Sequence, residues 1–520
     1  MPAKVFSCAT TGLNCELVQV EVDILGALNP SLSIVGLGDT AIQESKERIR
    51  AAFKNCEIPF PRKRKVVNLA PANLRKQGPI YDLPIAIGLL ISSELIDNPN
   101  LNKIIQESLF VGELSLDGTL RAINGVLAIS NFAKEKGFKR IFVPFNNALE
   151  SSLVPGIETI PVQNLKNLVL HLENKEILPK FLPPNNFQHL LKETKVNLDM
   201  KYIKSQEQGK RAIEISAAGG HNLLMNGPPG SGKTLLARTA QSILPELTID
   251  EALEITKIYS VAGLINHDQP LIVERPFRSV HHTASGVSIV GGGRIPGPGE
   301  ISLSHRGILF LDEFAEFPLH ILEYLRQPLE DKLVTIGRAS GTLTYPANFI
   351  LIASMNPCPC GYFTDPEKEC ICNEQQIKRY QKKISGPLLD RIDLCVEVPR
   401  LNYEKLSDTN EAESSKDIKK RIENARNIQL HRFKNDKITL NSEMGPKEIK
   451  EYCILDDQTL QILKKAVESM SLSGRSYFRI IKVSRTIADL SNSEKIHSNH
   501  LLEALQYRKK DYAYTKSYMN

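Results

Sequence analysis

The feature that most constrains this chain of 520 residues is a glycine-rich run that follows a short apolar segment. Residues 227–234 read Gly-Pro-Pro-Gly-Ser-Gly-Lys-Thr, which matches the pattern G-x-x-x-x-G-K-[ST] at every fixed position. The apolar residues 223–225 precede this run, and the helix-forming residues 235–240 follow it. Strand, glycine loop and helix in this order predict an α/β domain whose loop N–H groups surround phosphates. A glycine-rich turn that matches by chance is the alternative, and the flanking strand and helix argue against it.

Each residue of this loop has an expected part in binding ATP. The glycines let the backbone approach the phosphates, Lys233 is expected to reach the β- and γ-phosphates, and Thr234 to offer its hydroxyl to Mg²⁺. The residues predicted to bind ATP here are Gly227, Pro228, Pro229, Gly230, Ser231, Gly232, Lys233 and Thr234.

A second apolar segment ends in two acidic residues. Residues 308–311 read Ile-Leu-Phe-Leu and predict a fully buried strand, after which Asp312 and Glu313 follow. We expect Asp312 to hold Mg²⁺ through water and Glu313 to orient and deprotonate the attacking water. Two acids at the end of a strand are common, so this motif is specific only together with the glycine loop.

Two later motifs resemble those of AAA+ ATPases. Residues 353–357, Ala-Ser-Met-Asn-Pro, resemble the end of the sensor 1 strand, which implies that Asn356 reads the γ-phosphate. The run Gly-Pro-Leu-Leu-Asp-Arg-Ile-Asp resembles the segment that carries the arginine finger. This resemblance implies that Arg391 neutralises the transferred phosphoryl group on a neighbouring subunit. The alternative for Arg391 is a salt bridge with Asp390 or Asp393.

Two more segments carry the same resemblance. A Ser-Gly-Arg-Ser run opens a helix near the C-terminus and resembles sensor 2, which implies Arg475 as the sensor, with Arg479 as runner-up. A run upstream of the glycine loop resembles the segment that lines the adenine pocket, which implies that Ile203 and Gln206 lie near the base. Ser205 stands where this family usually has glycine, a departure that puts this pocket in doubt.

Within the AAA+ proteins, the chain is similar to the magnesium-chelatase-like branch and to its ComM (YifB) family of competence proteins. The specific motifs are residues 275–283, 291–300, 356–361 and 386–393, and Val280 departs from an expected proline. The resemblance implies a hexameric ring that uses ATP and Mg²⁺ to branch-migrate or unwind DNA during recombination in natural transformation, with a recombinase as candidate partner. The residues themselves indicate an ATPase and do not by themselves indicate a helicase.

Two insertions distinguish this branch. Residues 291–300 are too rich in glycine and proline for regular structure, and alternation in residues 332–345 predicts a β-hairpin. In related ring helicases such elements point into the central pore, whereas ordinary surface loops are the alternative. The residues expected to contact DNA phosphates are Arg338, Arg294 and Lys332. A salt bridge with Glu330 or Asp331 is the competing role for Arg338.

Four of the nine cysteines lie between residues 358 and 372. An odd total excludes complete internal disulfide pairing, and clustered thiolates suit a tetrahedral Zn²⁺ in a reducing compartment. Such a site would be structural, because four cysteines leave no open position, and four unliganded thiols are the alternative. The predicted zinc ligands are Cys358, Cys360, Cys370 and Cys372.

Two adjacent histidines, His281 and His282, receive no metal assignment. Along a strand, adjacent side chains face opposite ways, so the two rings would not easily share one ion. A packed or hydrogen-bonded histidine pair is therefore the expected arrangement.

Residues 20–145 resemble the ribosomal-S5-like fold that is shared with the Lon protease domain. Ile80 stands where an active Lon has its nucleophilic serine, and residues 123–129, which match the stretch of the catalytic lysine, contain no lysine. A Ser–Lys nucleophile needs both members, so we expect no proteolysis. The basic run 62–65 could contact phosphate or form a solvated charge cluster.

Motifs and apolar patterns together predict an α/β protein of three domains. An α+β domain that resembles ribosomal S5 domain 2 and Lon is expected at residues 1–180, a linker at 181–194, an AAA+ core with a parallel sheet at 195–400 and a helical lid at 401–520. The start of the chain lacks the pattern of a secretory signal, and no run of about 18 apolar residues follows. We therefore expect a cytoplasmic protein.

Composition leaves more than one function open. The net charge of +6 permits a polyanionic partner and does not demonstrate one. A DNA-translocating motor is the first hypothesis. A chelatase subunit that drives metal insertion into a tetrapyrrole, and an ATPase that remodels proteins, are the alternatives.

Overall fold

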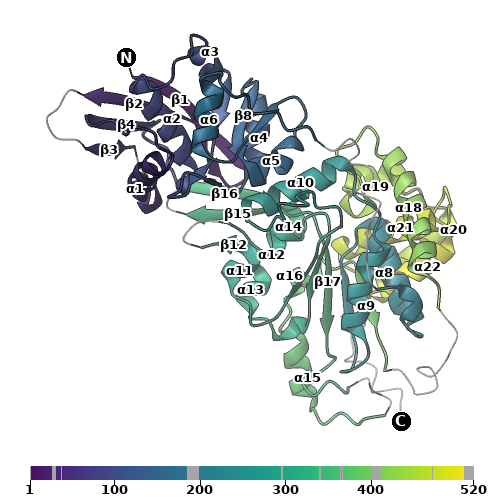
Figure 1. The fold of residues 1–520 in the computed structure, drawn as a ribbon. Helices are drawn as coiled ribbons and strands as arrows, with labels where there is room; N and C mark the ends of the chain where they lie inside the picture. The colour runs from purple at the N-terminus through teal and green to yellow at the C-terminus, as the bar shows by residue number, and fades with distance from the viewer. Residues whose placement is uncertain are drawn as a thin grey trace. The chain divides into compact units, whose positions relative to one another are not determined.

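The computed structural model describes residues 2–25, 31–36, 38–183, 198–293, 297–338, 341–363, 365, 367–400, 412–470 and 472–508. The chain divides into two units, each with its own contacts (Figure 1). The first comprises residues 1–190, 248–273 and 296–298, and the second comprises residues 191–247, 274–295 and 299–520. Residues 248–273, which lie inside the expected AAA+ range, therefore group with the N-terminal residues. The expected core and lid ranges, 195–400 and 401–520, group into one unit.

The first unit contains a four-stranded mixed sheet near the start of the chain (Figure 1). Its order is β1-β2-β4-β3, in which β2 is antiparallel to both of its neighbours and β3 runs parallel to β4. Val18, Val20 and Val22 are buried while the residues between them are partly exposed, the alternation that one buried face requires. These strands are β1 (Ala3–Thr11), β2 (Asn14–Leu25), β3 (Leu32–Val35) and β4 (Arg64–Ala70).

A parallel sheet and a short hairpin complete the strands of this unit. β5, β8 and β9 run parallel in that order, and β6 pairs antiparallel with β7. The strands are β5 (Ser108–Phe110), β6 (Glu113–Leu114), β7 (Leu120–Arg121), β8 (Arg140–Pro144) and β9 (Glu158–Val162). The helices are α1 (Thr40–Asn55), α2 (Asp82–Ser92), α3 (Leu101–Gln106), α4 (Val126–Glu135), α5 (Ala148–Ser152), α6 (Leu165–Leu172), α10 (Ile249–Val261) and the 3₁₀ helices η1 (Pro79–Tyr81) and η2 (Phe145–Asn147).

Helix α10 joins this unit from the central part of the sequence. The N–H of Gly125 donates to the carbonyl of Ser260 at 3.1 Å, and the Ser260 hydroxyl donates to the buried carboxylate of Glu150. Burial raises the pKa of Glu150, which the hydroxyl of Ser260 and the N–H of Leu127 oppose by stabilising the charged form. The expected AAA+ range, 195–400, includes this helix, whereas the helix groups with the N-terminal residues.

The second unit is built on a five-stranded sheet in which every strand runs parallel to its neighbours. Its order is β11-β14-β17-β10-β18. The three central strands consist mainly of buried apolar residues, as parallel strands with two covered faces require. The strands are β10 (Leu223–Asn226), β11 (Phe277–Val280), β14 (Ile308–Leu311), β17 (Ile350–Met355) and β18 (Leu394–Glu397). Their carboxyl ends meet at one edge, which is where ligands bind in open α/β sheets.

Helices and short strands surround this sheet. The alternation that predicts a hairpin corresponds to β15 (Leu333–Arg338), which pairs antiparallel with β16 (Gly341–Pro346). Among the described residues, no helix has the length and apolar character that a membrane crossing needs. The other elements of this unit before residue 400 are α8 (Glu207–Gly219), α9 (Lys233–Thr239), α11 (Gly286–Val290), α12 (Glu300–Leu303), α13 (Leu319–Glu323), α14 (Arg326–Asp331), α15 (Glu374–Gln381), α16 (Gly386–Leu389), β12 (Gly291–Gly292), η3 (Met200–Tyr202), η4 (Ala240–Ile243) and η5 (Phe314–Glu316). The short strand β13 (Gly297–Pro298) belongs to the first unit.

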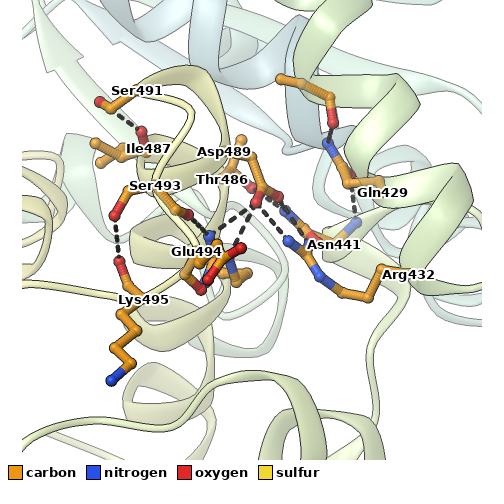
Figure 2. A network of polar contacts seen from close by, with 12 residues as sticks. Gln429, Arg432, Asn441, Thr486, Ile487, Asp489, Ser491, Ser493, Glu494 and Lys495 are labelled. Atoms are coloured by element: carbon orange, nitrogen blue, oxygen red, sulfur yellow. Dashed lines mark hydrogen bonds and ion pairs between the residues drawn. The ribbon is translucent and has the colours of Figure 1, made fainter.

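The C-terminal part of this unit is helical, and a buried polar network holds its helices together (Figure 2). Asp489 accepts hydrogen bonds from Arg432 at 2.5 and 2.8 Å, from Asn441 at 2.8 Å and from Arg485 at 3.1 Å. Because Asp489 and Arg485 are almost fully buried, each charge depends on the other for stabilisation. The helices are α18 (Ser415–Arg432), α19 (Pro446–Tyr452), α20 (Asp457–Ser469), α21 (Gly474–Leu490), α22 (Ser498–Gln506) and η6 (Asn441–Glu443).

Replacing Asp489 with alanine should destabilise these helices by about 3–5 kcal/mol, because two arginines would keep their burial and lose their counter-ion. Amide hydrogen exchange along α21 measures the free energy at which the C-terminal helices open. This measurement does not assume that the two units unfold together. Glu468→Ala, an exposed acid on α20, is the matched control and should stay within about 0.5 kcal/mol of the unaltered protein. Equal protection in the two variants would contradict the role given to Asp489.

Candidate nucleotide-binding site

The glycine loop connects the end of β10 with the first residue of α9. Gly230 and Gly232 have φ values of 75° and 86°, a left-handed conformation that other residues adopt only with strain. A side chain at Gly227 would place its Cβ 2.1 Å from the carbonyl oxygen of Val398. The sequence of the loop therefore matches the backbone that wraps around a phosphate group.

Lys233 lies inside this loop. Its amine donates to the carbonyl oxygens of Gly227 at 2.7 Å and Pro228 at 2.8 Å. Burial lowers the pKa of this amine to about 8, and the negative charge of Asp312 opposes the shift. The loop thus holds a cation that an incoming anion would stabilise.

The structure brings the two expected Mg²⁺ ligands together. The Thr234 hydroxyl donates to one carboxylate oxygen of Asp312 at 2.8 Å, and the Ser354 hydroxyl on β17 donates to the other. A hydroxyl and a carboxylate are oxygen ligands of the kind that Mg²⁺ prefers, so these residues fit that ion. Asn356 follows the same strand, and its Oδ1 lies 3.4 Å from the amine of Lys233.

Glu313 has a contact that the sequence analysis missed. Its side chain is half exposed, its φ is 53°, and its Oε2 lies 2.9 Å from Nδ1 of His282. The rings of His281 and His282 lie 4.1 Å apart, which confirms a packed pair. The expectation that the two rings face opposite ways is wrong, because β11 ends at Val280 and the histidines lie beyond the strand. The only sequence signal for His282 is its place just after the strand that neighbours β14.

The predicted adenine segment contacts the loop. Gln206 donates from Nε2 to the carbonyl oxygens of Pro399 at 2.8 Å and Ser231 at 3.2 Å, while its buried Oε1 has no hydrogen-bond partner among the residues that the structure describes. Ile203 is buried in the core of the same unit. Ser205 has a φ of 55°, which explains why a glycine would fit this position without strain.

Arg391 pairs with an acid that the sequence analysis did not name for it. One guanidinium nitrogen contacts the Glu330 carboxylate, and another donates to the carbonyl of Pro387 at 2.7 Å. Arg475 approaches the other carboxylate oxygen of Glu330 at 3.6 Å. Among the described residues, neither Asp390 nor Asp393 forms an ion pair with Arg391, so the alternative pairing weighed for them is wrong.

The backbone around Arg391 is held from several sides. Arg479 on α21 donates to the carbonyls of Leu389 and Ile392, and it pairs with Asp390 at 3.3 Å. Asn222 donates from Nδ2 to the carbonyl of Arg391 at 2.9 Å.

A buried histidine adds a further connection to this segment. His221 lies 3.2 Å from a carboxylate oxygen of Asp393 and 2.8 Å from the hydroxyl of Thr486 on α21. Burial raises the pKa of Asp393, but the hydrogen bond and charge of His221 outweigh it, so the pKa is lowered overall. Hydrogen bonds from α21 and from the residues that precede β10 therefore fix the position of the segment that carries Arg391.

The four clustered cysteines converge. Sγ–Sγ distances are 3.3 Å for Cys358–Cys360, 3.6 Å for Cys360–Cys370 and 3.7 Å for Cys358–Cys370, and Cys372 completes a group within 4.8 Å. Sulfurs bound to one tetrahedral Zn²⁺ at about 2.3 Å would lie roughly 3.8 Å apart, so the four cysteines fit this ion. Burial and the neighbouring thiols raise the pKa of Cys358 to about 12.

One thiol of this cluster ionises more readily than the others. Burial opposes the ionisation of Cys360, but hydrogen bonds from the backbone of Tyr362 and from the neighbouring thiols outweigh it, and the pKa falls to about 6. The cysteine segment also lies against the glycine loop, because a Cβ at Gly361 would come 2.6 Å from the ring of Pro229. The cysteine segment therefore packs directly against the glycine loop.

The residues expected to contact DNA are only partly described. Arg294 and the side chain of Arg338 lie outside the described residues. Lys332 ends α14 with a φ of 57° and is half-buried. Burial lowers its pKa, which the charges of Glu443 and Asp393 oppose. This lysine therefore lies at the base of the β15–β16 hairpin, next to acids of its own unit.

In the first unit, the Lon-like positions carry no nucleophile. Ile80 lies in η1 and is buried, and a buried lysine nearby, Lys76, donates its amine to the carbonyl of Pro71. Lys65 of the basic run is also buried, with its amine on the carbonyls of Pro61 at 2.6 Å and Lys63 at 2.8 Å. Lys65 is therefore not part of a solvated charge cluster.

The chain is similar to known proteins over almost its whole length. The family described as magnesium chelatase, subunit ChlI, matches residues 199–406, and two related descriptions, subunit ChlI of Mg-chelatase and its C-terminal part, match residues 20–147 and 412–508. The competence protein ComM of Haemophilus influenzae is 42% identical over 515 residues, which are 97% of this chain and 97% of ComM. The chain belongs to the ComM/YifB family of magnesium-chelatase-like AAA+ ATPases.

Other relatives extend this result. The uncharacterized protein YifB of Escherichia coli is 41% identical over 503 residues, 96% of each chain. The archaeal Lon protease of Methanocaldococcus jannaschii is 27% identical over 172 residues, 31% of this chain and 26% of that protease. Membership in the AAA+ ATPases implies ATP and Mg²⁺ as ligands, which the geometry of Lys233, Thr234 and Asp312 fits.

The affinity for ATP should weaken about tenfold between pH 7 and pH 9, because phosphate binds the charged form of Lys233 and the free protein loses that proton near pH 8. Titration with a fluorescent ATP analogue measures this, with Glu313→Gln in the background to slow turnover. Lys233→Arg keeps its charge over this range, so its affinity should change less than about twofold. A constant affinity of the Lys233 protein up to pH 9 would contradict the assignment.

Proposed function

We propose that this chain is an ATP-driven motor that translocates on DNA as a hexameric branch-migration helicase in recombination during natural transformation. The observation that carries the proposal is the meeting of Lys233, Thr234 and Asp312 at one edge of a parallel sheet, in a chain 42% identical to a competence protein. The family descriptions, which name magnesium chelatase, favour a second candidate: an ATPase subunit that drives metal insertion into a tetrapyrrole.

Each residue of the site has a part in the proposed hydrolysis. Lys233 neutralises the β- and γ-phosphates, while Thr234 and Asp312 hold Mg²⁺, which offsets charge on the phosphates when bound. Glu313 orients the attacking water and takes its proton. Asn356, next to the amine of Lys233, donates its amide N–H to the γ-phosphate.

The buried acceptor on Gln206 supports the proposed adenine pocket. In the described part of the chain its Oε1 has no partner, and a buried polar atom of this kind is costly unless a ligand or water supplies a donor. The exocyclic amine of adenine is such a donor. Ile203 would supply the apolar surface beside the base.

We assign Arg391 and Arg475 to the nucleotide of a neighbouring subunit. Among the described residues, neither guanidinium contacts a residue of the glycine loop in its own chain. A ring of subunits supplies the missing partner, because each subunit then offers its arginines to the next. In this proposal the C-terminal helices are the lid, the first unit is an S5-like domain without peptidase activity, and the ring acts in the cytoplasm with a recombinase as candidate partner.

The β15–β16 hairpin is the proposed contact with DNA, through Arg338 and through Lys332 at the hairpin base. Arg294, in the glycine-rich insertion of residues 291–300, is a further proposed contact. Phosphate contacts carry no sequence information, which suits a motor that must accept any strand. They also release counter-ions, so binding should weaken steeply with salt.

Arg338→Ala should lower the stimulation of ATP turnover by DNA and reduce the log–log salt slope of DNA binding by roughly one unit. ATP turnover is measured with single-stranded, duplex and forked DNA, and binding is measured over a salt series. Arg379→Ala, an exposed arginine on α15, is the matched control and should keep the original slope. If a tetrapyrrole stimulates ATP turnover and no DNA does, the chelatase candidate is favoured over the DNA motor.

We further propose one structural Zn²⁺ per chain at Cys358, Cys360, Cys370 and Cys372. Elemental analysis of protein purified without chelator should find about one zinc per chain, the capacity of one four-cysteine site. Cys370→Ser should lose the metal, whereas Cys15→Ser, on β2 of the other unit, should keep it. A fully folded preparation without metal would contradict the site.

A further inference from the structure

Glu330 is an acid with two basic partners that come from distant parts of the chain. It lies near the end of α14, and its two carboxylate oxygens face Arg391, beyond α16, and Arg475, at the start of α21. The Arg391 side chain is 13% exposed, whereas those of Glu330 and Arg475 are 53% and 58% exposed. The three side chains form a cluster in which one carboxylate separates two cations.

A phosphate group would suit the same two arginines. Guanidinium groups bind carboxylate and phosphate alike, and Arg391 and Arg475 each face one Glu330 oxygen through one nitrogen. Arg391 is also incompletely satisfied, because its buried Nε has no hydrogen-bond partner among the described residues. The negative charge of the Glu330 carboxylate would repel a phosphoryl group beside these guanidinium groups, so the two anions compete for Arg391 and Arg475.

We propose that Glu330 is a brake that competes with the neighbouring subunit's nucleotide for Arg391 and Arg475. This rests on the proposed function, which gives these arginines to the neighbouring site. Hydrolysis then requires the arginines to exchange one anion for another. Glu330 is thereby a residue that acts on catalysis through Arg391 and does not itself touch the nucleotide.

The exchange of partners needs only side chains to move, because the backbone around Arg391 is held in place. Arg479, Asn222 and the His221–Asp393 contact hold the backbone of the segment, and none of these contacts involves Glu330. Loss of the Glu330 carboxylate would therefore free the guanidinium and leave the segment in place.

The position of Glu330 also connects the brake to the β15–β16 hairpin. Lys332, two residues later, closes α14 with its N–H on the carbonyl of Pro328 at 3.0 Å, and β15 starts at the next residue. A displacement of the hairpin would carry this short helix and its acid along. We infer that a ligand that moves the hairpin withdraws Glu330 and releases both arginines.

The test compares Glu330→Gln, which keeps the shape and removes the charge, with Asp331→Asn, which makes the same charge change one residue later. Asp331 is exposed and forms no ion pair or hydrogen bond among the described residues. Glu330→Gln should raise ATP turnover without DNA about two- to fivefold, the factor that a half-exposed ion pair supports, while Asp331→Asn should leave it unchanged. Turnover of Glu330→Gln at or below that of the unaltered protein, with an unchanged melting temperature, would overturn the brake.

A second variant separates the brake from other effects of the lost charge. With Arg391→Ala and Arg475→Ala together in the background, Glu330→Gln should no longer accelerate turnover, because both residues on which it acts are gone. Acceleration that persists there would overturn the proposal. If DNA stimulates ATP turnover of the unaltered protein, the factor of stimulation should be smaller for Glu330→Gln. If no DNA stimulates the unaltered protein, the proposed DNA motor is wrong. The comparison of turnover rates without DNA still tests the brake in that case.

Discussion

The hydrogen bond between the Thr234 hydroxyl and the Asp312 carboxylate is the contact on which the site depends. It joins the first turn of α9 to the end of β14, and β17 lies between β14 and β10 in the sheet. Ser354 on β17, the strand between them, donates to the same carboxylate. Because parallel strands present their carboxyl ends at one edge, three segments far apart in sequence meet there without long loops.

The same edge depends on the C-terminal helices. Arg479 and Thr486 lie on α21, whose far end carries Asp489 in the buried network with Arg432 and Arg485 (Figure 2). Hydrogen bonds to buried charges are directional and costly to break, so they select one orientation of α21 more sharply than apolar packing would. A shift of α21 would therefore pull on the segment that carries Arg391, and the two arginines beside Glu330 would move with it.

The sequence predicts the parts of the site whose residues are neighbours in the chain. The glycine loop, the two acids after β14 and the hairpin follow from local pattern, because each pattern matches one local backbone geometry. The partners of Glu313 and Arg391 could not be predicted in this way. His282 and Glu330 have ordinary sequence surroundings, and only the order of the strands and the packing of α14 bring them to their partners.

The packing of α10 could not be predicted from local pattern either. Residues 249–261 lie in the middle of the expected AAA+ range, yet α10 packs with α4 of the N-terminal residues through the Gly125–Ser260 and Ser260–Glu150 contacts. Helical periodicity identifies the apolar face of a helix, but it does not identify the surface against which that face packs. Ser205 is a different case: its departure from glycine casts doubt on the adenine segment, and the structure accommodates it at a φ of 55° that a non-glycine residue adopts only with some strain.

Two residues with proposed catalytic roles already have a partner in their own chain: Glu313 has His282, and Arg391 has Glu330. Formation of the active arrangement is then an exchange of partners and not the ordering of free side chains, which would cost rotamer entropy. Pairs with one half-exposed member contribute only about 0–1 kcal/mol, so the exchange needs little free energy in either direction. A site built this way responds to small displacements of α14 or α21, because a shift of either helix weakens one pair and leaves the sheet that holds Thr234 and Asp312 unchanged.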